Sequence, residues 1–102
     1  MEEIILNIIM HSGESRSHSM EALALAKVGR IDEARKLIIK ADEELGYAHA
    51  SQTNLIQGEA ACDKVEFSLL LVHAEDHLMT AMTFRDLAVE LIDVHEKLKS
   101  IN

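Results

Sequence analysis

The sequence contains no proline, no tryptophan and only three other aromatic residues among its 102 residues. A chain with so few β-favouring residues is a poor candidate for a sandwich or a barrel. Only four glycines are available to interrupt regular structure. Alanine, leucine, isoleucine, glutamate and lysine dominate instead, and most of these are good helix formers. The composition therefore predicts an all-α fold.

Cysteine and positive charge are also scarce. Cys62 is the only cysteine, so no disulfide can form within the chain, and a reducing, cytoplasmic setting is expected. The formal net charge of -8 disfavours nucleic acid and anionic membranes, because Lys and Arg bind their phosphates. No apolar run approaches the roughly 20 residues that cross a bilayer, and the start Met-Glu-Glu lacks the basic residues of a signal peptide. We expect a single domain over residues 1–102 without direct membrane insertion.

Apolar residues recur at helical spacing in three segments. The first helix is expected from about Glu3 to Val28, with Gly29 in the usual glycine stop position. The second is expected from near Asp32, a good N-cap, to near Ala60. Inside the first helix, Gly13 costs roughly 1 kcal/mol relative to alanine. Either the helix bends there or something packs closely against this glycine.

The third helix is expected from about Val65 to Ser100, after a short connection at residues 61–64. Short connections make neighbouring helices antiparallel, which predicts a three-helix bundle. At about 1.5 Å per residue, the third helix would be about 50 Å long, which is long for a lone bundle of this size. Its late apolar residues follow the 4-3-4 spacing of a coiled-coil seam: Leu87, Leu91, Val94 and Leu98. We therefore expect self-association.

A repeat architecture is the one competing interpretation of these helices. Residues 26–34 resemble the turn of a tetratricopeptide unit, but the other signature positions are missing and the pattern does not recur. A repeat array needs several copies to bury its faces. We therefore set this interpretation aside.

Two histidines, His73 and His77, lie one helical turn apart in the third segment, with Asp76 beside them. At about 100° per residue, the two imidazoles share one face of the helix. An imidazole nitrogen is nucleophilic near neutral pH and can also bind a proton or a metal. Aspartate seldom enters a core unpaired. This group of side chains is therefore the candidate for chemistry.

Three interpretations of this group are open from the residues alone. A histidine on an apolar helix face is most often a hydrogen-bonded core residue. The spacing His-x-x-x-His also suits a zinc site, but Ala74 stands where a metalloprotease has glutamate, and a third strong ligand would have to come from another subunit. The third interpretation is a phosphohistidine carrier. In that case His77, Ser68 or Thr80 would donate hydrogen bonds to the phosphoryl oxygens.

Three segments of the sequence resemble one family. Val72-His73-Ala74-Glu75-Asp76-His77-Leu78-Met79 resembles the active-site signature of the lactose/cellobiose-type IIA component of the bacterial phosphoenolpyruvate-dependent sugar phosphotransferase system. Ser12-Gly13-Glu14-Ser15-Arg16-Ser17 matches a second family segment with one change, at Ser15. A third match has Ala48-His49, Gln52-Thr53 and Leu55-Ile56 in the family's spacing. Three motifs in the right order are far more specific than one, and the resemblance covers nearly the whole chain.

The resemblance implies a three-helix subunit that assembles as a homotrimer. His73 matches the histidine that carries the phosphoryl group, and His77 matches a second histidine near the site. Asp76 matches an aspartate that, one from each subunit, surrounds a metal ion on the trimer axis. Carboxylate oxygens suit a divalent ion such as Mg²⁺ better than zinc. The family accepts the phosphoryl group from the carrier protein HPr and passes it to a cysteine of the IIB component, for uptake of a lactose/cellobiose-class sugar.

Glu75 departs from the family pattern, which usually has glutamine at this position. Ionised glutamate cannot donate a hydrogen bond. Because Glu75 lies about 200° around the helix from His73, it is expected to face another helix or subunit. Facing a phosphorylated neighbour, it would repel the phosphoryl group unless it is protonated or paired with a base such as Arg16. We predict that Glu75 slows transfer relative to glutamine. The alternative function is a diverged, non-catalytic helical module that binds partners or metal.

Overall fold

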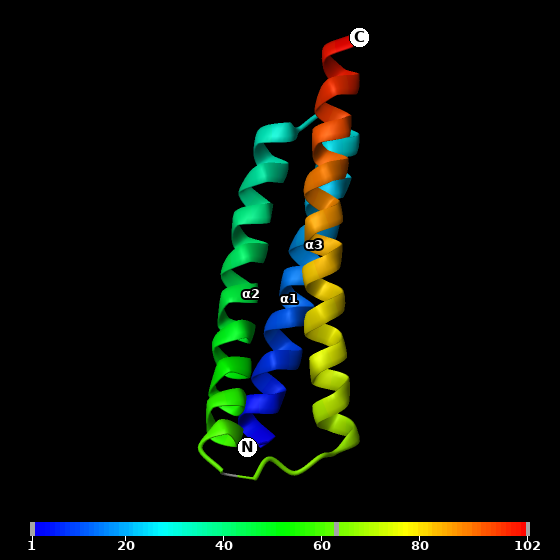
Figure 1. The fold of residues 1–102 in the computed structure, drawn as a ribbon. Coiled ribbons are helices and arrows are strands. Elements are labelled where there is room, and N and C mark those ends of the chain that lie inside the picture. Colours follow the sequence, from blue (N-terminus) through cyan, green and yellow to red (C-terminus); the bar gives the residue numbers. More distant parts are fainter. Residues whose placement is uncertain (1, 63, 102) are drawn as a thin grey trace.

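The structure, a computed structural model, describes residues 2–62 and 64–101. These residues form three long helices: α1 Glu2–Lys27, α2 Ile31–Ala60 and α3 Leu69–Ile101. α1 and α3 run in the same direction and α2 runs against both (Figure 1). The molecule is a rod of 58 × 21 × 16 Å, in which the last turns of α3 extend beyond the other two helices. The predicted all-α, antiparallel three-helix bundle is confirmed.

A glycine ends α1 as predicted. Gly29 has a φ of 82°, a left-handed conformation that glycine adopts without steric penalty. The Arg30 amide then donates a hydrogen bond to the Leu25 carbonyl oxygen at 3.0 Å, which pairs one of the free carbonyls at the helix end. The expected N-cap of α2 at Asp32 is wrong. Arg30 occupies the cap position because the buried Ile31 already belongs to the helix, and Asp32 lies within its first turn.

The connection between α2 and α3 is longer than the sequence suggested. α3 begins at Leu69 and not near Val65. The reason is an N-cap at Ser68, whose Oγ accepts a hydrogen bond from a backbone amide of the first turn at 3.1 Å. The expected connection at residues 61–64 therefore extends to residue 68. One of its residues, Asp63, lies outside the described part of the chain.

The core contains two apolar clusters, one at each end of the rod. The lower cluster, near the start of α1 and α3, consists of Ile5, Ile8, Ala48, Leu55, Ala74 and Leu78. The upper cluster consists of Ala22, Ala26, Ile31, Ala34, Ile38, Ala88 and Ile92. Between these levels α1 buries Ser12, Ser15 and Ser19, whose hydroxyls have no hydrogen-bond partner among the described residues. Small side chains thus let α1 approach both neighbours closely.

Polar side chains bridge α2 and α3. Arg85 of α3 forms two hydrogen bonds with the carboxylate of Asp42 in α2, at 2.5 and 2.9 Å. Arg35 of α2 donates to Asp93 and Glu96 of α3 at 3.0 and 2.9 Å. Hydrogen bonds to Asp42 and Asp93 are the main causes that raise the pKa of the two guanidinium groups. A bidentate pair fixes orientation as well as distance, so these bridges help to set the register of α3 against α2.

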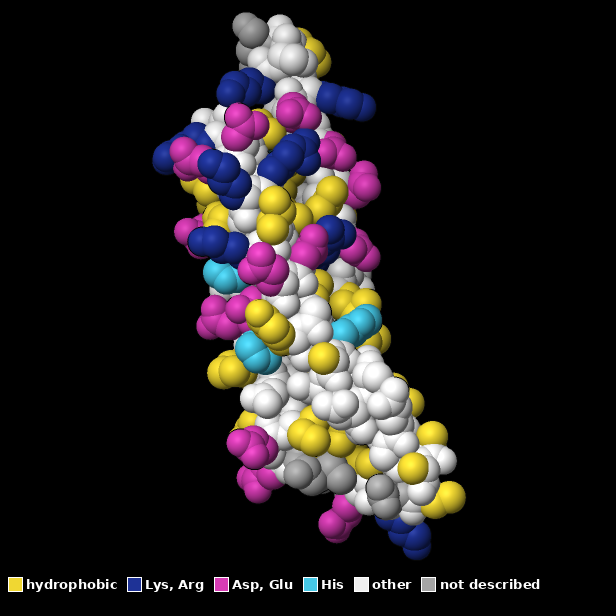
Figure 2. Space-filling model, turned by 90° about the vertical axis from the view of Figure 1, so that its left-hand side faces the viewer, with side chains coloured by type: hydrophobic (Ala, Val, Ile, Leu, Met, Phe, Trp, Pro, Cys, Tyr) yellow, Lys and Arg dark blue, Asp and Glu magenta, His cyan; other side chains and the backbone are white. Residues whose placement is uncertain are grey.

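Charged side chains are unevenly distributed over the surface. On the face in Figure 2, most Lys, Arg, Asp and Glu side chains lie over the upper half of the rod, and histidines lie near its middle. Over residues 2–62 and 64–101, no helix has an apolar stretch long enough to cross a membrane. The lower end of the rod is therefore the less charged end of this face.

Ser15→Ala should stabilise the fold, because it removes a buried hydroxyl that has no hydrogen-bond partner in the described part of the chain. Such a group costs roughly 1–3 kcal/mol. Ser17→Ala is the matched control. Because Ser17 is exposed, this substitution brings only the gain of a few tenths of a kcal/mol in helix propensity that both substitutions share. In urea denaturation at fixed protein concentration, Ser15→Ala should raise the free energy of unfolding by about 1 kcal/mol more than the control. Equal gains for the two variants would contradict this explanation.

Candidate functional site

His73 and His77 lie in the second and third turns of α3. Their ring centroids are 5.1 Å apart and the ring planes are nearly perpendicular, at 76°, which is an edge-to-face contact. His73 is exposed and His77 is half-buried. On the buried side of the same turns, Ala74 and Leu78 pack into the lower cluster and fix the position of α3. His73 therefore presents its ring to solvent from a well-anchored helix.

Glu75 points away from the two histidines and toward α2. Gln52 of α2 donates a hydrogen bond from Nε2 to Glu75 Oε2 at 2.5 Å. Glu75 is half-buried, whereas Arg16, the expected basic partner, is exposed on α1. The observed partner is therefore a neutral amide, which orients the carboxylate but supplies no opposite charge.

Asp76 is exposed, and it belongs to a line of exposed residues along α3. We call this line the α3 seam; it consists of Asp76, Thr83, Leu87, Leu91, Val94 and Leu98. Within the described residues of one chain, no group of three or more His, Cys, Asp or Glu side chains is placed to hold a metal ion. A carboxylate supplies at most two of the six or more oxygens that Mg²⁺ or Ca²⁺ takes. A metal site at Asp76 would therefore need carboxylates from other copies of the chain.

His73 and Glu75 lie on opposite sides of the α3 seam. Glu75 precedes Asp76 by about 100° around the helix, whereas His73 lies about 60° from Asp76 in the other direction. Because Glu75 contacts Gln52 of α2, its side is the α2 flank of the seam. The side with His73 is then the α1 flank.

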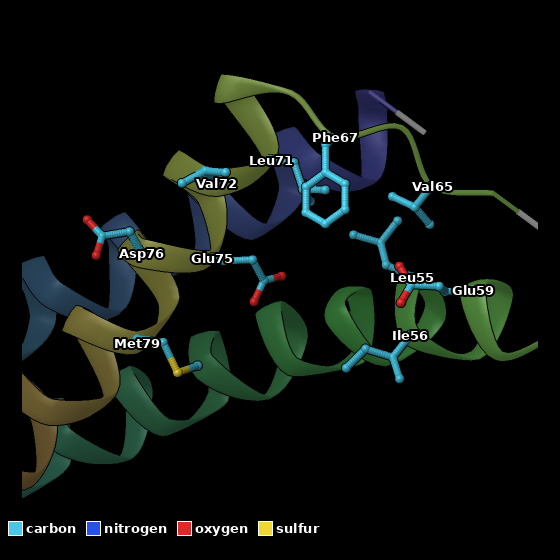
Figure 3. A pocket seen from close by; sticks show the side chains of 10 residues that line it. All are labelled: Leu55, Ile56, Glu59, Val65, Phe67, Leu71, Val72, Glu75, Asp76 and Met79. Atoms are coloured by element: carbon cyan, nitrogen blue, oxygen red, sulfur yellow. The ribbon is translucent and has the colours of Figure 1, made fainter.

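A groove of about 500 Å³ lies between α2 and α3 on the α2 flank. Its apolar lining includes Leu55, Ile56, Phe67, Leu71, Val72 and Met79, and the carboxylates of Glu59, Glu75 and Asp76 border it. Figure 3 shows the Glu75 side chain pointing from α3 into the space between the two helices, whereas Asp76 points away from it. Phe67, from the connection before α3, lies over the same space. The groove is thus an apolar hollow with an acidic border.

Two features of the site were missed from the sequence. Gln52 was recognised within a family segment, but its pairing with Glu75 depends on how α2 packs against α3. The groove depends on the late start of α3, which Ser68 before the apolar run could have indicated as an N-cap signal. The hydroxyl of Ser68, one of the expected donors to a phosphoryl group, accepts a backbone hydrogen bond at the helix start through its oxygen.

Comparison with known proteins agrees with the family resemblance of the three sequence segments. Residues 3–96 match the family described as the lactose/cellobiose-specific IIA subunit of the phosphotransferase system (PTS). The lichenan-specific phosphotransferase enzyme IIA component of Bacillus subtilis is 55% identical over 98 residues, covering 96% of this chain and 89% of the relative.

Solved structures agree with the fold over nearly all of the chain. The crystal structure of the PTS cellobiose-specific enzyme IIA from Bacillus anthracis has a TM-score of 0.97 at 48% identity, covering 99% of this chain and 93% of that one. A solution structure of the IIA(chitobiose)–HPr complex of Escherichia coli matches with a TM-score of 0.84 at 45% identity, covering 96% and 95% of the two chains. The chain therefore belongs to the family of lactose/cellobiose-specific IIA subunits of the phosphotransferase system.

Proposed function

We propose that the chain is a phosphotransferase component that carries a phosphoryl group on His73. The observation that supports this most directly is an exposed imidazole at the family's signature position, in edge contact with a second imidazole at 5.1 Å. An unprotonated ring nitrogen of His73 would attack the phosphorus of a donor phosphohistidine. The donor's N–P bond breaks as the new N–P bond forms. His77 is positioned to donate a hydrogen bond to the transferred group.

HPr is the proposed donor, because a relative that shares this fold forms a complex with HPr. The proposed acceptor is a cysteine of the IIB component. There the N–P bond at His73 breaks and an S–P bond forms, before the sugar is phosphorylated during uptake. The sugar is proposed to be of the lactose/cellobiose class, from the family match. These exchanges would take place in the cytoplasm, where the exposed Cys62 stays reduced.

His73 should be the phosphorylated residue and His77 should not. The test is incubation with phosphoenolpyruvate, the first enzyme of the system and HPr, followed by intact-mass measurement of an acid-labile phosphoryl group. His73→Ala should abolish labelling, whereas His77→Ala should slow it without abolishing it. His95→Ala, about six turns beyond His73 on α3, is the control and should label normally. Labelling that survives in His73→Ala would contradict the assignment, and an unlabelled wild-type chain would favour the non-catalytic binding module.

We further propose a homotrimer with Asp76 at the three-fold axis. The supporting observation is the exposure of the α3 seam, whose spacing of 7, 4, 4, 3 and 4 residues follows a coiled-coil stripe. Three carboxylates meeting on an axis repel one another unless a cation or protons intervene. Asp76 from three copies would offer up to six oxygens, which fits a hard cation such as Mg²⁺. The ion would offset the repulsion between the carboxylates.

Asp76→Leu should therefore preserve or strengthen the trimer when metal is removed with a chelator. Asp86→Leu is the matched control, because Asp86 is also exposed on α3 but lies off the seam. Sedimentation equilibrium with and without chelator should show metal dependence for the wild type and for the control. The Asp76→Leu trimer should be independent of metal. A wild-type monomer at micromolar concentration would rule out the assembly.

Glu75→Gln should speed phosphoryl transfer from phosphorylated HPr. The transferred group carries about -2 charge. Within one chain Glu75 points away from His73, but in the proposed trimer it would face the phosphoryl group of a neighbouring copy, and removing a partly desolvated carboxylate there is worth about 1–2 kcal/mol, or roughly ten-fold in rate. Glutamine can still accept the hydrogen bond from Gln52, so the fold should be unchanged. Glu59→Gln is the matched control, because it removes one negative charge from the border of the same groove.

The rates should be measured at low and high salt. The advantage of Glu75→Gln should shrink as salt rises, because exposed charges are screened over about 8–10 Å at physiological ionic strength. An equal gain from Glu59→Gln would indicate a general effect of net charge. Equal rates for Glu75→Gln and wild type at every salt concentration would show that the Glu75 carboxylate does not face the phosphoryl group.

A further inference from the structure

The connection between α2 and α3 has an apolar pattern that neither helix uses. Val65 and Phe67 line the groove between the two helices, whereas Glu66, which stands between them, is exposed and does not line it. Side chains two residues apart lie on the same side of an extended chain. The connection therefore has an apolar side that borders the groove and a polar side that faces solvent.

Phe67 borders the groove but is not buried in it. Its side chain is 84% exposed, although the ring lies over the space between α2 and α3 (Figure 3). Burial of a phenylalanine side chain among apolar neighbours is strongly favourable. The ring and an apolar hollow of about 500 Å³ therefore lie side by side, and each leaves apolar surface open to water.

The start of α3 gives the Phe67 ring a partner at the groove. Ser68 caps the helix by accepting a hydrogen bond from the Leu71 amide, so Phe67 is the residue directly before the cap. An apolar residue at this position often packs against the residue four places after the cap, a contact known as a hydrophobic staple. That residue is Val72, which lines the groove and is 55% exposed. Both members of the expected staple thus border the groove, and both are open to solvent.

Few bonds hold the backbone of the connection before this cap. The Ala61 amide donates a hydrogen bond to the Gln57 carbonyl oxygen at 3.0 Å, and the cap at Ser68 holds the other end. Between these points, no backbone hydrogen bond joins residues 64–67 to either helix in the described part of the chain. Residues 65–67 can therefore change their backbone angles without breaking a helical hydrogen bond.

We propose that residues 65–67 form a strap that closes the groove from within the chain. In the closed state the Phe67 ring packs between Val72 of α3 and Ile56 of α2, and it covers the hydrogen bond between Gln52 and Glu75; the structure shows the strap open. An apolar group from another molecule must displace the ring before it can enter the groove. The strap is thus a built-in competitor for the groove. It needs only one copy of the chain, so the inference does not rest on the proposed function or on its assembly.

Binding of Nile red, an uncharged apolar dye, tests the competition. Phe67→Ala should raise the affinity for the dye by about three-fold or more in a fluorescence titration, because it removes the competing ring. Leu69→Ala is the matched control: Leu69 is 86% exposed but does not line the groove, so its loss should leave dye binding unchanged or weaker. Adding Ile56→Glu to Phe67→Ala should cancel the gain. Equal affinities for Phe67→Ala and the wild type would overturn the inference.

Tryptophan fluorescence tests the closed state without a ligand. The chain has no tryptophan, so Phe67→Trp introduces a single reporter, and Glu66→Trp is the control on the polar side of the strap. Acrylamide should quench Phe67→Trp with a constant about two-fold or more below that of the control, because a closed strap shields the ring. Adding Ile56→Glu should raise the constant to the control value, with unchanged helix content by circular dichroism. Equal quenching of the two reporters, or no response to Ile56→Glu, would overturn the inference. Neither readout depends on phosphoryl transfer, so the labelling of His73 tests the proposed function separately.

Discussion

The close packing of α1 against both of its neighbours is the constraint on which the rest of the structure depends. Serine and alanine side chains line much of its buried face, so α1 approaches α2 and α3 closely along its length. α2 and α3 contact each other less than either contacts α1. They are joined by long polar side chains, such as Arg85 to Asp42. The gap that this geometry leaves at the lower end is the groove.

The same geometry separates the two kinds of chemistry on α3. Glu75 lies on the side of α3 that faces the gap to α2, where it is half-buried and hydrogen-bonded to Gln52. His73 lies on the other side of the seam, where it is exposed. One turn of helix therefore places an imidazole and a carboxylate in different surroundings, although they are only two residues apart. Neither side chain would keep this orientation if α3 rotated, and the burial of Ala74 and Leu78 between the neighbouring helices prevents such rotation.

Features encoded over a few residues were predictable from the sequence, and features that need two helices were not. The apolar spacing located all three helices, and Gly29 marked the end of the first by a local backbone requirement. The start of α3 was missed because apolar Val65 and Phe67 extend the helical pattern upstream of the cap at Ser68. The family segments identified His73, but the bond between Gln52 and Glu75 spans two helices and cannot be derived from spacing along one. For Gly13 the sequence predicts either a bend in the helix or a close approach, and within the described chain nothing lies within 4 Å of the position that a Cβ would take there.

The energy of the phosphorylated state is therefore a property of the proposed assembly more than of one chain. A phosphoryl group adds about -2 charge to a chain whose net charge is already -8. Within one chain Glu75 lies about 160° around α3 from His73, and solvent screens exposed charges over about 8–10 Å. In the proposed trimer, the carboxylates of Asp76 would converge on the axis, and Glu75 of one copy would approach His73 of another. A cation on the axis would lower the energy of the phosphorylated state and Glu75 would raise it. Because both effects would act on the energy of the phosphorylated state, the proposed assembly would couple the metal to residue 75. Substitution of Glu75 would then change how strongly phosphorylation depends on the metal.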